Sequence, residues 1–495
     1  MTLNQYTPEE PITSIATALA PAALGIIRVS GKNSIQLVSK CFSRPKALLE
    51  AMGNTVVYGW IVEKENEELG SRNEELGSRN EESWRKIDEV MCAVYRAPKS
   101  FTGEDMVEIF CHGGPSVVTA VQNLMLKSGF RQANRGEYTF RAYINGKTDL
   151  TKAEAVKEII DSHTDVSRSH AVGRLSGSLF TEIDQIKKLI IDTLATIEVE
   201  IEYPEDEETI ADTFNRSDIE NAITRLQSLA DSWKSEKLYQ DGARVVLAGR
   251  TNAGKSSLFN AILKEERAIV SDIEGTTRDW LESWASINGI PVRLFDTAGL
   301  RETDDVIEAR GVQLTRNLAT DADVVLYLID STVGMNEEDI SFIKNASEPL
   351  IVVFTKADIN EGESLPPGSH SVAHTPPSAH SDAMRNAGLN VTSVYISSKN
   401  GKGMKDLFDE AEKLLTAGLT TEREQAGIGS ERQKNAVAQA LECVKHALVS
   451  ADDNYTLDAV VQDLEDALDF LGEVTGDVTP EDVLGSIFAN FCVGK

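Results

Sequence analysis

At 495 residues the chain is long enough for about two to four domains, and its hydrophobic fraction of 41% is ordinary for a soluble protein. The net charge of −30, from 49 Lys and Arg against 79 Asp and Glu, argues against a protein whose whole surface binds nucleic acid, because phosphate binding needs local positive potential. No apolar run approaches the roughly 18 residues of a membrane span, and the first residues lack a signal-peptide pattern, so we expect a cytoplasmic protein without a membrane segment.

Residues 1–146 are expected to form an α/β domain. Segments with the apolar pattern of strands occur at residues 25–31, 55–61 and 89–95. A direct repeat over residues 66–82, NEELGSRNEELGSRNEE, is strongly polar and predicts an exposed loop with no chemistry of its own. Residues 100–115, SFTGEDMVEIFCHGGP, are denser in reactive side chains and predict a turn, a strand and a Gly-rich turn.

Helical periodicity predicts an all-α domain in two parts, residues 147–240 and 417–495. Between them, over residues 241–416, strand and helix patterns alternate, which predicts a doubly wound α/β domain inserted into the helical one. Residues 361–387 are rich in Ser, Pro and His. A flexible surface insertion is favoured there over a histidine metal tract.

Residues 249–256, GRTNAGKS, match the phosphate-loop pattern G-x-x-x-x-G-K-[ST]. They stand between a buried-strand pattern at 245–248 and a plausible helix at 257–263. In that order, backbone N–H groups at the start of the helix can cradle phosphates. Lys255 can then reach the β- and γ-phosphates and Ser256 can bind Mg²⁺.

Four shorter motifs follow in order: GTTRD at 275–279, DTAG at 296–299, TKAD at 355–358 and SSK at 397–399. Asp296 is placed to bind Mg²⁺ through water, and the Gly299 N–H to sense the γ-phosphate. Asp358 can accept both N1–H and the 2-amino group of guanine, which adenine cannot offer, so the set predicts GTP rather than ATP. Thr355 stands where guanine-binding loops usually carry Asn, which predicts a different hydrogen bond to brace the loop.

Together with DTAGLRET at 296–303, GEYTFRAYINGKTDLTKAEAV at 136–156 and FCVGK at 491–495, these motifs resemble the MnmE (TrmE) tRNA-modification GTPases from about residue 15 to the end. The resemblance implies a GTP hydrolase that modifies C5 of the wobble uridine of certain tRNAs, adding an aminomethyl or carboxymethylaminomethyl group. It also implies a homodimer and a hetero-oligomer with the FAD protein MnmG (GidA), which could supply much of the RNA contact.

The resemblance implies a K⁺ ion in place of an arginine finger, held by Asn252, Ser271, Ile273 and Thr276. A cation between the β- and γ-phosphates stabilises the charge that develops during hydrolysis. Thr277 would bind Mg²⁺ with Ser256, and Glu308 would orient the attacking water. The implied GTP-binding set is Asn252, Ala253, Gly254, Lys255, Ser256, Ser257, Ser271, Thr276, Thr277, Asp296, Thr297, Ala298, Gly299, Thr355, Lys356, Asp358, Ser397, Ser398 and Lys399.

For the N-terminal domain the resemblance implies a 5-formyl-tetrahydrofolate or related folate at a dimer interface. Arg28, Glu108, Lys147 and Lys495 match its ligands; an Arg or Lys suits the folate glutamate, and a carboxylate suits the N–H edge of the pterin. Cys492 becomes a candidate for chemistry only through the C-x-G-K match. Whether it acts as a nucleophile or positions another group stays open.

A GTPase switch in ribosome assembly, without one-carbon chemistry, is the alternative function. It accounts for the nucleotide motifs between residues 244 and 415. It leaves the N-terminal domain and the FCVGK ending without a role, so the tRNA-modification hypothesis is favoured.

Overall fold

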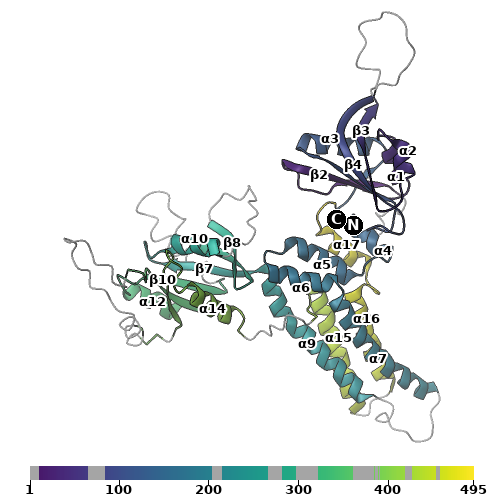
Figure 1. Ribbon diagram of the computed structural model, residues 1–495. Helices are drawn as coiled ribbons and strands as arrows, with labels where there is room; N and C mark the ends of the chain where they lie inside the picture. Colours follow the sequence, from purple (N-terminus) through teal and green to yellow (C-terminus); the bar gives the residue numbers. More distant parts are fainter. Residues whose placement is uncertain are drawn as a thin grey trace, which may run out of the picture. The chain divides into compact units, whose positions relative to one another are not determined.

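The computed structural model describes residues 10–64, 84–202, 215–265, 281–296, 321–359, 384, 388–389, 391–417, 426–452 and 457–494. The chain divides into two compact units, residues 1–157 with 471–495, and residues 158–470 (Figure 1). The predicted four-domain division stays a prediction. The repeat at 66–82 lies outside the described residues, as does the 361–387 insertion apart from Met384.

The first unit contains a mixed sheet of six strands in the order β3-β4-β5-β2-β1-β6. Its pairs are antiparallel except for β1 with β6, which is parallel. The three strands predicted from apolar patterns are present, whereas β1 and β6 were not predicted because four and two residues are too short to give a pattern. The strands are β1 (Ile12–Ile15), β2 (Ala22–Ser30), β3 (Thr55–Lys64), β4 (Trp84–Tyr95), β5 (Met106–Gly113) and β6 (Arg131–Gln132).

One face of this sheet packs on helices α1 (Ser34–Ser39), α2 (Pro45–Leu49) and α3 (Pro115–Lys127). Side chains alternate between the faces of a strand, so Ile27 and Ile109 enter this core while their neighbours Arg28 and Glu108 lie on the opposite face. The sequence order of apolar and charged residues in β2 and β5 therefore sets which face carries the charged pair.

The C-terminal residues return to the first unit. Helix α17 (Glu481–Ala489) packs on α4 (Glu137–Ile144), where the rings of Phe140 and Phe488 meet edge to face with centroids 5.3 Å apart. Gly136 has a φ of 68°, and a Cβ there would lie 2.5 Å from the Phe488 carbonyl oxygen. This close approach requires glycine.

The helices α6 (Asp165–Leu175), α7 (Ser178–Glu202), α9 (Arg216–Asp241) and α15 (Glu431–Asp452) belong to the second unit, while α5 (Leu150–Asp161) and α16 (Leu457–Thr475) cross its limits. Helices α9 and α15 run antiparallel, with contacts from Arg216 to Asp452 and from Gln227 to Lys445. The prediction that residues 147–240 and 417–495 are mainly helical is confirmed for the described residues of both segments. Among the described residues, no helix is both long and apolar enough to cross a membrane.

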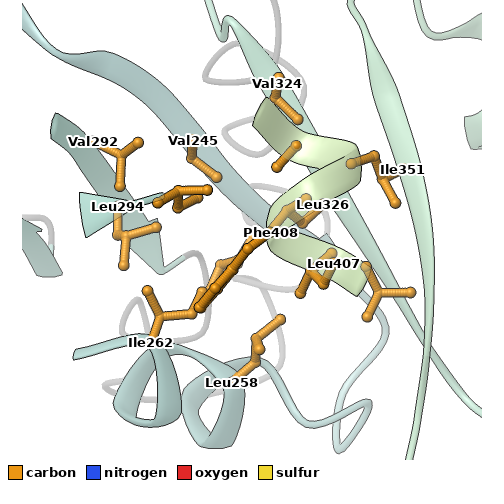
Figure 2. Packing of buried hydrophobic residues seen from close by; sticks show 14 of the residues in the cluster. Val245, Leu258, Ile262, Val292, Leu294, Val324, Leu326, Ile351, Leu407 and Phe408 are labelled. Carbon is orange, nitrogen blue, oxygen red and sulfur yellow. The ribbon is translucent and has the colours of Figure 1, made fainter. Parts of the chain in front are cut away.

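The rest of the second unit is a doubly wound α/β domain with strand order β12-β11-β10-β7-β9-β8, parallel except for β8. Figure 2 shows its core, where Val245, Leu294 and Leu326 of the sheet lie against Leu258 and Phe408 of two helices. The elements are β7 (Ala243–Gly249), α10 (Lys255–Glu265), β8 (Leu281–Ile287), β9 (Ile290–Asp296), β10 (Val324–Asp330), α12 (Glu337–Asn345), β11 (Leu350–Thr355), β12 (Ser393–Tyr395) and α14 (Met404–Leu415).

Candidate functional site

The phosphate loop joins the carboxyl end of β7 to α10, beside β10. Gly249 has a φ of 133°, and a Cβ there would lie 2.3 Å from the Leu328 carbonyl oxygen, so only glycine fits. The Lys255 ammonium donates to the carbonyls of Gly249, at 2.7 Å, and Arg250, at 2.8 Å. The amine is thereby held over the loop in which phosphates would lie.

Two oxygen groups suited to Mg²⁺ lie together beside this loop. The Ser256 hydroxyl donates to Oδ2 of Asp296 at 2.9 Å. Ser256 stands in the first turn of α10, and Asp296 is the buried last residue of β9, so the parallel pairing of β7 with β9 brings them to one edge of the sheet. A hydroxyl and a carboxylate are hard oxygen ligands of the kind Mg²⁺ prefers.

The two predicted base-reading loops are linked to each other and to the phosphate loop. The buried Thr355 hydroxyl donates to the Ala253 carbonyl at 2.7 Å, and the Ala357 N–H donates to the Ile396 carbonyl at 3.0 Å. Thr355 therefore makes the loop-bracing contact with a hydroxyl where Asn would use an amide. The next residue after Ile396, Ser397, is fully buried and begins the SSK loop.

Lys356 lies beside the same loops in a left-handed conformation, with a φ of 59°. Its ammonium pairs with Oδ2 of Asp330, the last residue of β10, at 2.5 Å. Burial alone would raise the pKa of Asp330, but the hydrogen bonds from Lys356 and Thr332 outweigh it and hold that pKa below its ordinary value. The Lys356 stem is thus fixed at the sheet edge next to the half-buried Asp358.

The remaining predicted nucleotide residues are only partly described. Asn252 and Ser257 are exposed, and Asn252 takes the left-handed φ of 61° that Asn tolerates. Ser398 is half-buried and Lys399 exposed, with the Lys399 N–H donating to the Ser397 hydroxyl oxygen at 3.3 Å. The predicted residues that lie outside the described ones are Ser271, Ile273, Thr276, Thr277, Thr297, Ala298, Gly299, Glu308 and Lys495.

In the first unit, Arg28 of β2 and Glu108 of β5 form an ion pair at 2.7 Å on the sheet face opposite the helices. A second guanidinium nitrogen of Arg28 donates to the Gly494 carbonyl at 2.8 Å. The Tyr95 hydroxyl donates to Oε2 of Glu108 at 3.4 Å, and burial, then the charge of Glu108, raises the Tyr95 pKa. The Tyr138 hydroxyl donates to the Arg28 carbonyl at 2.7 Å.

Among the described residues of the chain end, Gly494 contacts this pair through its carbonyl oxygen. Gly494 has a φ of 95°, and a Cβ there would lie 2.8 Å from the Ile15 carbonyl oxygen. Cys492 is exposed, and its carbonyl accepts from the Gly136 N–H at 3.5 Å. Lys147 is not joined to Arg28 or Glu108 by any contact among the described residues; its ammonium donates to the Pro98 carbonyl at 3.0 Å.

The sequence did not indicate that Tyr95, Tyr138 and Gly494 would contact Arg28 or Glu108. Tyr138 stands in the GEYTF motif and Gly494 in the FCVGK ending, so the motifs contained them without showing their role. Their position depends on strand register and on the return of the chain end, neither of which a motif reveals.

The parallel sheet, with its Gly-rich turn between β7 and α10, defines a P-loop nucleotide-binding domain. Residues 150–492 match the family model described as the MnmE helical domain, and residues 11–147 match that described as the GTP-binding protein TrmE N-terminus. The chain is 47% identical to the tRNA modification GTPase MnmE of Treponema denticola, with all of both chains covered. It is 38% identical to that of Borrelia turicatae, over 99% of this chain and all of the other. The chain therefore belongs to the MnmE family of tRNA modification GTPases.

Among solved structures, the chain is similar to a single-residue variant of Era from Aquifex aeolicus bound to GDP.AlF4-, with 24% identity and a TM-score of 0.27. That match covers 41% of this chain and 66% of the other. The assignment to the family rests on the matching family models and the full-length relatives instead.

Proposed function

We propose that the chain hydrolyses GTP and, in the cytoplasm with an FAD-containing MnmG partner, modifies C5 of the wobble uridine of certain tRNAs with a folate one-carbon unit. The single observation that carries the GTPase part is the meeting of Lys255, the Ser256–Asp296 pair and the Thr355 loop at one edge of the parallel sheet. The phosphates and the base of one nucleotide, and a metal ion bound to its phosphates, can all be reached from that edge of the sheet.

Among the described residues, Ser256, Asp296 and Asn252 lie in or beside the phosphate loop and carry oxygen atoms suited to cations. Ser256 and Asp296 would hold Mg²⁺ with Thr277, and the amide oxygen of the exposed Asn252 would hold K⁺ with Ser271, Ile273 and Thr276. Both ions, when bound, would neutralise charge on the phosphates. Lys255 orients the β- and γ-phosphates, and Glu308 orients the attacking water.

The Arg28–Glu108 pair supports the folate part of the proposal. Their side chains are only 18% and 15% exposed, and the neighbouring Tyr95 adds an aromatic surface to the charged pair. A guanidinium can bind a folate carboxylate with two parallel hydrogen bonds, and Glu108 can accept from the pterin edge. Lys147 and Lys495 would add positive charge, and Cys492 would act near the one-carbon unit.

An uncovered part of the same sheet face supports a homodimer. Val56 and Tyr58 of β3 and Met91 of β4 are 62%, 53% and 45% exposed, and register places them on the face that carries Arg28 and Glu108. Exposed apolar side chains gathered on one face mark an interaction surface. A second copy of the chain on this face would border the Arg28–Glu108 pair, which fits a folate held between two protomers.

The test measures GTP hydrolysis in K⁺ and in Na⁺ at equal ionic strength, and binding of 5-formyl-tetrahydrofolate by calorimetry. We expect hydrolysis to fall at least about tenfold when Na⁺ replaces K⁺, since a cation that fits poorly stabilises less transition-state charge. Equal rates in the two salts would refute the K⁺ assignment. Hydrolysis without folate binding would favour the ribosome-assembly switch instead.

A further inference from the structure

A buried carboxylate lies behind the phosphate loop. Asp339 has no exposed surface and stands in the first turn of α12. Its Oδ1 accepts from the Tyr327 hydroxyl at 2.9 Å, and its Oδ2 accepts from the Asn336 N–H at 2.9 Å. The Arg250 guanidinium reaches the same Oδ2 at 3.1 Å. A buried charge with partners on both oxygens is held in one orientation, because losing any partner is costly.

Arg250 connects this carboxylate to the phosphate loop. It is the second residue of GRTNAGKS, and its guanidinium also donates to the Gly334 carbonyl at 2.6 Å. Its own carbonyl accepts from Lys255, the residue proposed to reach the phosphates. The position of the Arg250 side chain therefore fixes a backbone oxygen that holds the Lys255 amine.

We infer that Arg250 is a positioning residue, whose ion pair with Asp339 keeps the phosphate loop in its nucleotide-accepting shape before GTP binds. This inference rests on the GTP site proposed above. A loop already in its bound shape loses less conformational freedom on binding, so the pair contributes to affinity. Once GTP is bound, the phosphates order the loop themselves, and the pair adds little to the chemical step.

The amino ends of strands β7 and β10 offer a matched control. Arg244, near the start of β7, pairs with Asp321 at 3.6 Å, and its N–H donates to Asp323 at 2.7 Å just before β10. This contact lies at the amino ends of β7 and β10, whereas the Arg250–Asp339 pair lies beyond their carboxyl ends and joins the phosphate loop to α12. Asp323→Ala therefore removes a link between the strands without touching the site.

The experiment uses the full-length protein with Arg250→Gln, Arg250→Lys, Tyr327→Phe and Asp323→Ala. It measures KM and kcat for GTP, release of a fluorescent GDP analogue, and thermal unfolding. We expect Arg250→Gln to raise KM and the release rate about tenfold, with kcat within about twofold of the parent, since charged hydrogen bonds are lost. Arg250→Lys should recover part of the affinity. Tyr327→Phe removes one hydroxyl and should shift KM in the same direction by about two- to threefold.

Asp323→Ala should lower the unfolding temperature and leave KM unchanged. The inference is overturned if Arg250→Gln and Tyr327→Phe leave KM unchanged, if Asp323→Ala raises KM as much, or if kcat falls while KM stays constant. Should Arg250→Gln fail to fold, Tyr327→Phe decides alone, because phenylalanine keeps the ring packing. Failure of the parent protein to bind the GDP analogue would instead refute the GTP site, which separates the two proposals.

Discussion

The phosphate loop and the Arg28–Glu108 site differ in how far apart along the chain their contacting residues stand. Lys255 contacts the carbonyls of Gly249 and Arg250, all within one motif. Arg28 contacts Glu108, 80 residues away, and Gly494, 466 residues away. A contiguous motif builds its own geometry through local turns, whereas the second site exists only when strand register and the chain end are both in place.

The largest expected effect is a loss of GTP hydrolysis when the phosphate loop itself is changed. Lys255→Ala should lower kcat/KM for GTP by at least about 100-fold, because the charge aimed at the phosphates is lost. Folate binding should stay unchanged, since the two sites share no residue. The measurement is steady-state hydrolysis beside folate calorimetry, with the exposed Lys264→Ala in the same helix as control. A parallel loss of folate binding would show that the two sites are coupled and would contradict their expected independence.

A smaller loss is expected when Arg28 is changed to Met. The substitution removes the ion pair with Glu108 and the hydrogen bond to Gly494. Folate affinity should fall by about 10- to 100-fold, in keeping with loss of charged hydrogen bonds, while KM for GTP stays constant. Calorimetry with 5-formyl-tetrahydrofolate checks this. Arg44→Met, which removes an exposed Arg of the same unit, should bind folate as the parent does.

The difference between contacts within one motif and contacts between separate segments explains how much of the structure the sequence could predict. The doubly wound sheet, the strand before the phosphate loop and the helix after it follow from apolar runs and a spaced motif, and all are present. The contact of Gly494 with Arg28 could not be predicted, because it joins residues 466 apart in the chain. The contact of Tyr95 with Glu108 depends on the register of β4 against β5, which no motif reveals. Strand β8 was missed because a mixture of small and charged residues, LESWASI, gives no strong period.

The smallest effect at the nucleotide site is expected for Thr355, which contacts the phosphate loop from a distant part of the chain. Thr355→Val keeps the shape of the side chain but removes the hydrogen bond to the Ala253 carbonyl in a buried place. Loss of one neutral hydrogen bond costs about 1 kcal/mol, so GTP affinity should fall about fivefold. Thr355→Asn should retain most of the affinity through an amide donor. A fluorescent GTP analogue measures both, and equal affinity in Thr355→Val would show that the loop does not depend on this contact.

One histidine in each unit has a shifted pKa, and the two shifts have opposite directions. In the first unit, the hydrogen bond from His112 to Asp88, followed by the charge of Asp88, raises the pKa of His112 above 6.5. In the second, burial lowers the pKa of His163, whose ring stacks on Trp284 with centroids 3.8 Å apart; Asp161 opposes this shift. NMR titration of the two imidazole rings in the full-length protein should give midpoints on opposite sides of 6.5.

The two histidines contribute to the free energy of unfolding in opposite pH ranges. His112 gains its partner when protonated, so its contribution is complete below the unfolded pKa and is lost as the pH rises through the higher folded value. His163 is favoured in its neutral form, so its contribution is present above the unfolded pKa and is lost as the pH falls through the lower folded value. His112→Gln and His163→Gln assign the two resonances. Coincident midpoints would mean that Asp88 and the Trp284 stack do not set the charge of these rings in solution.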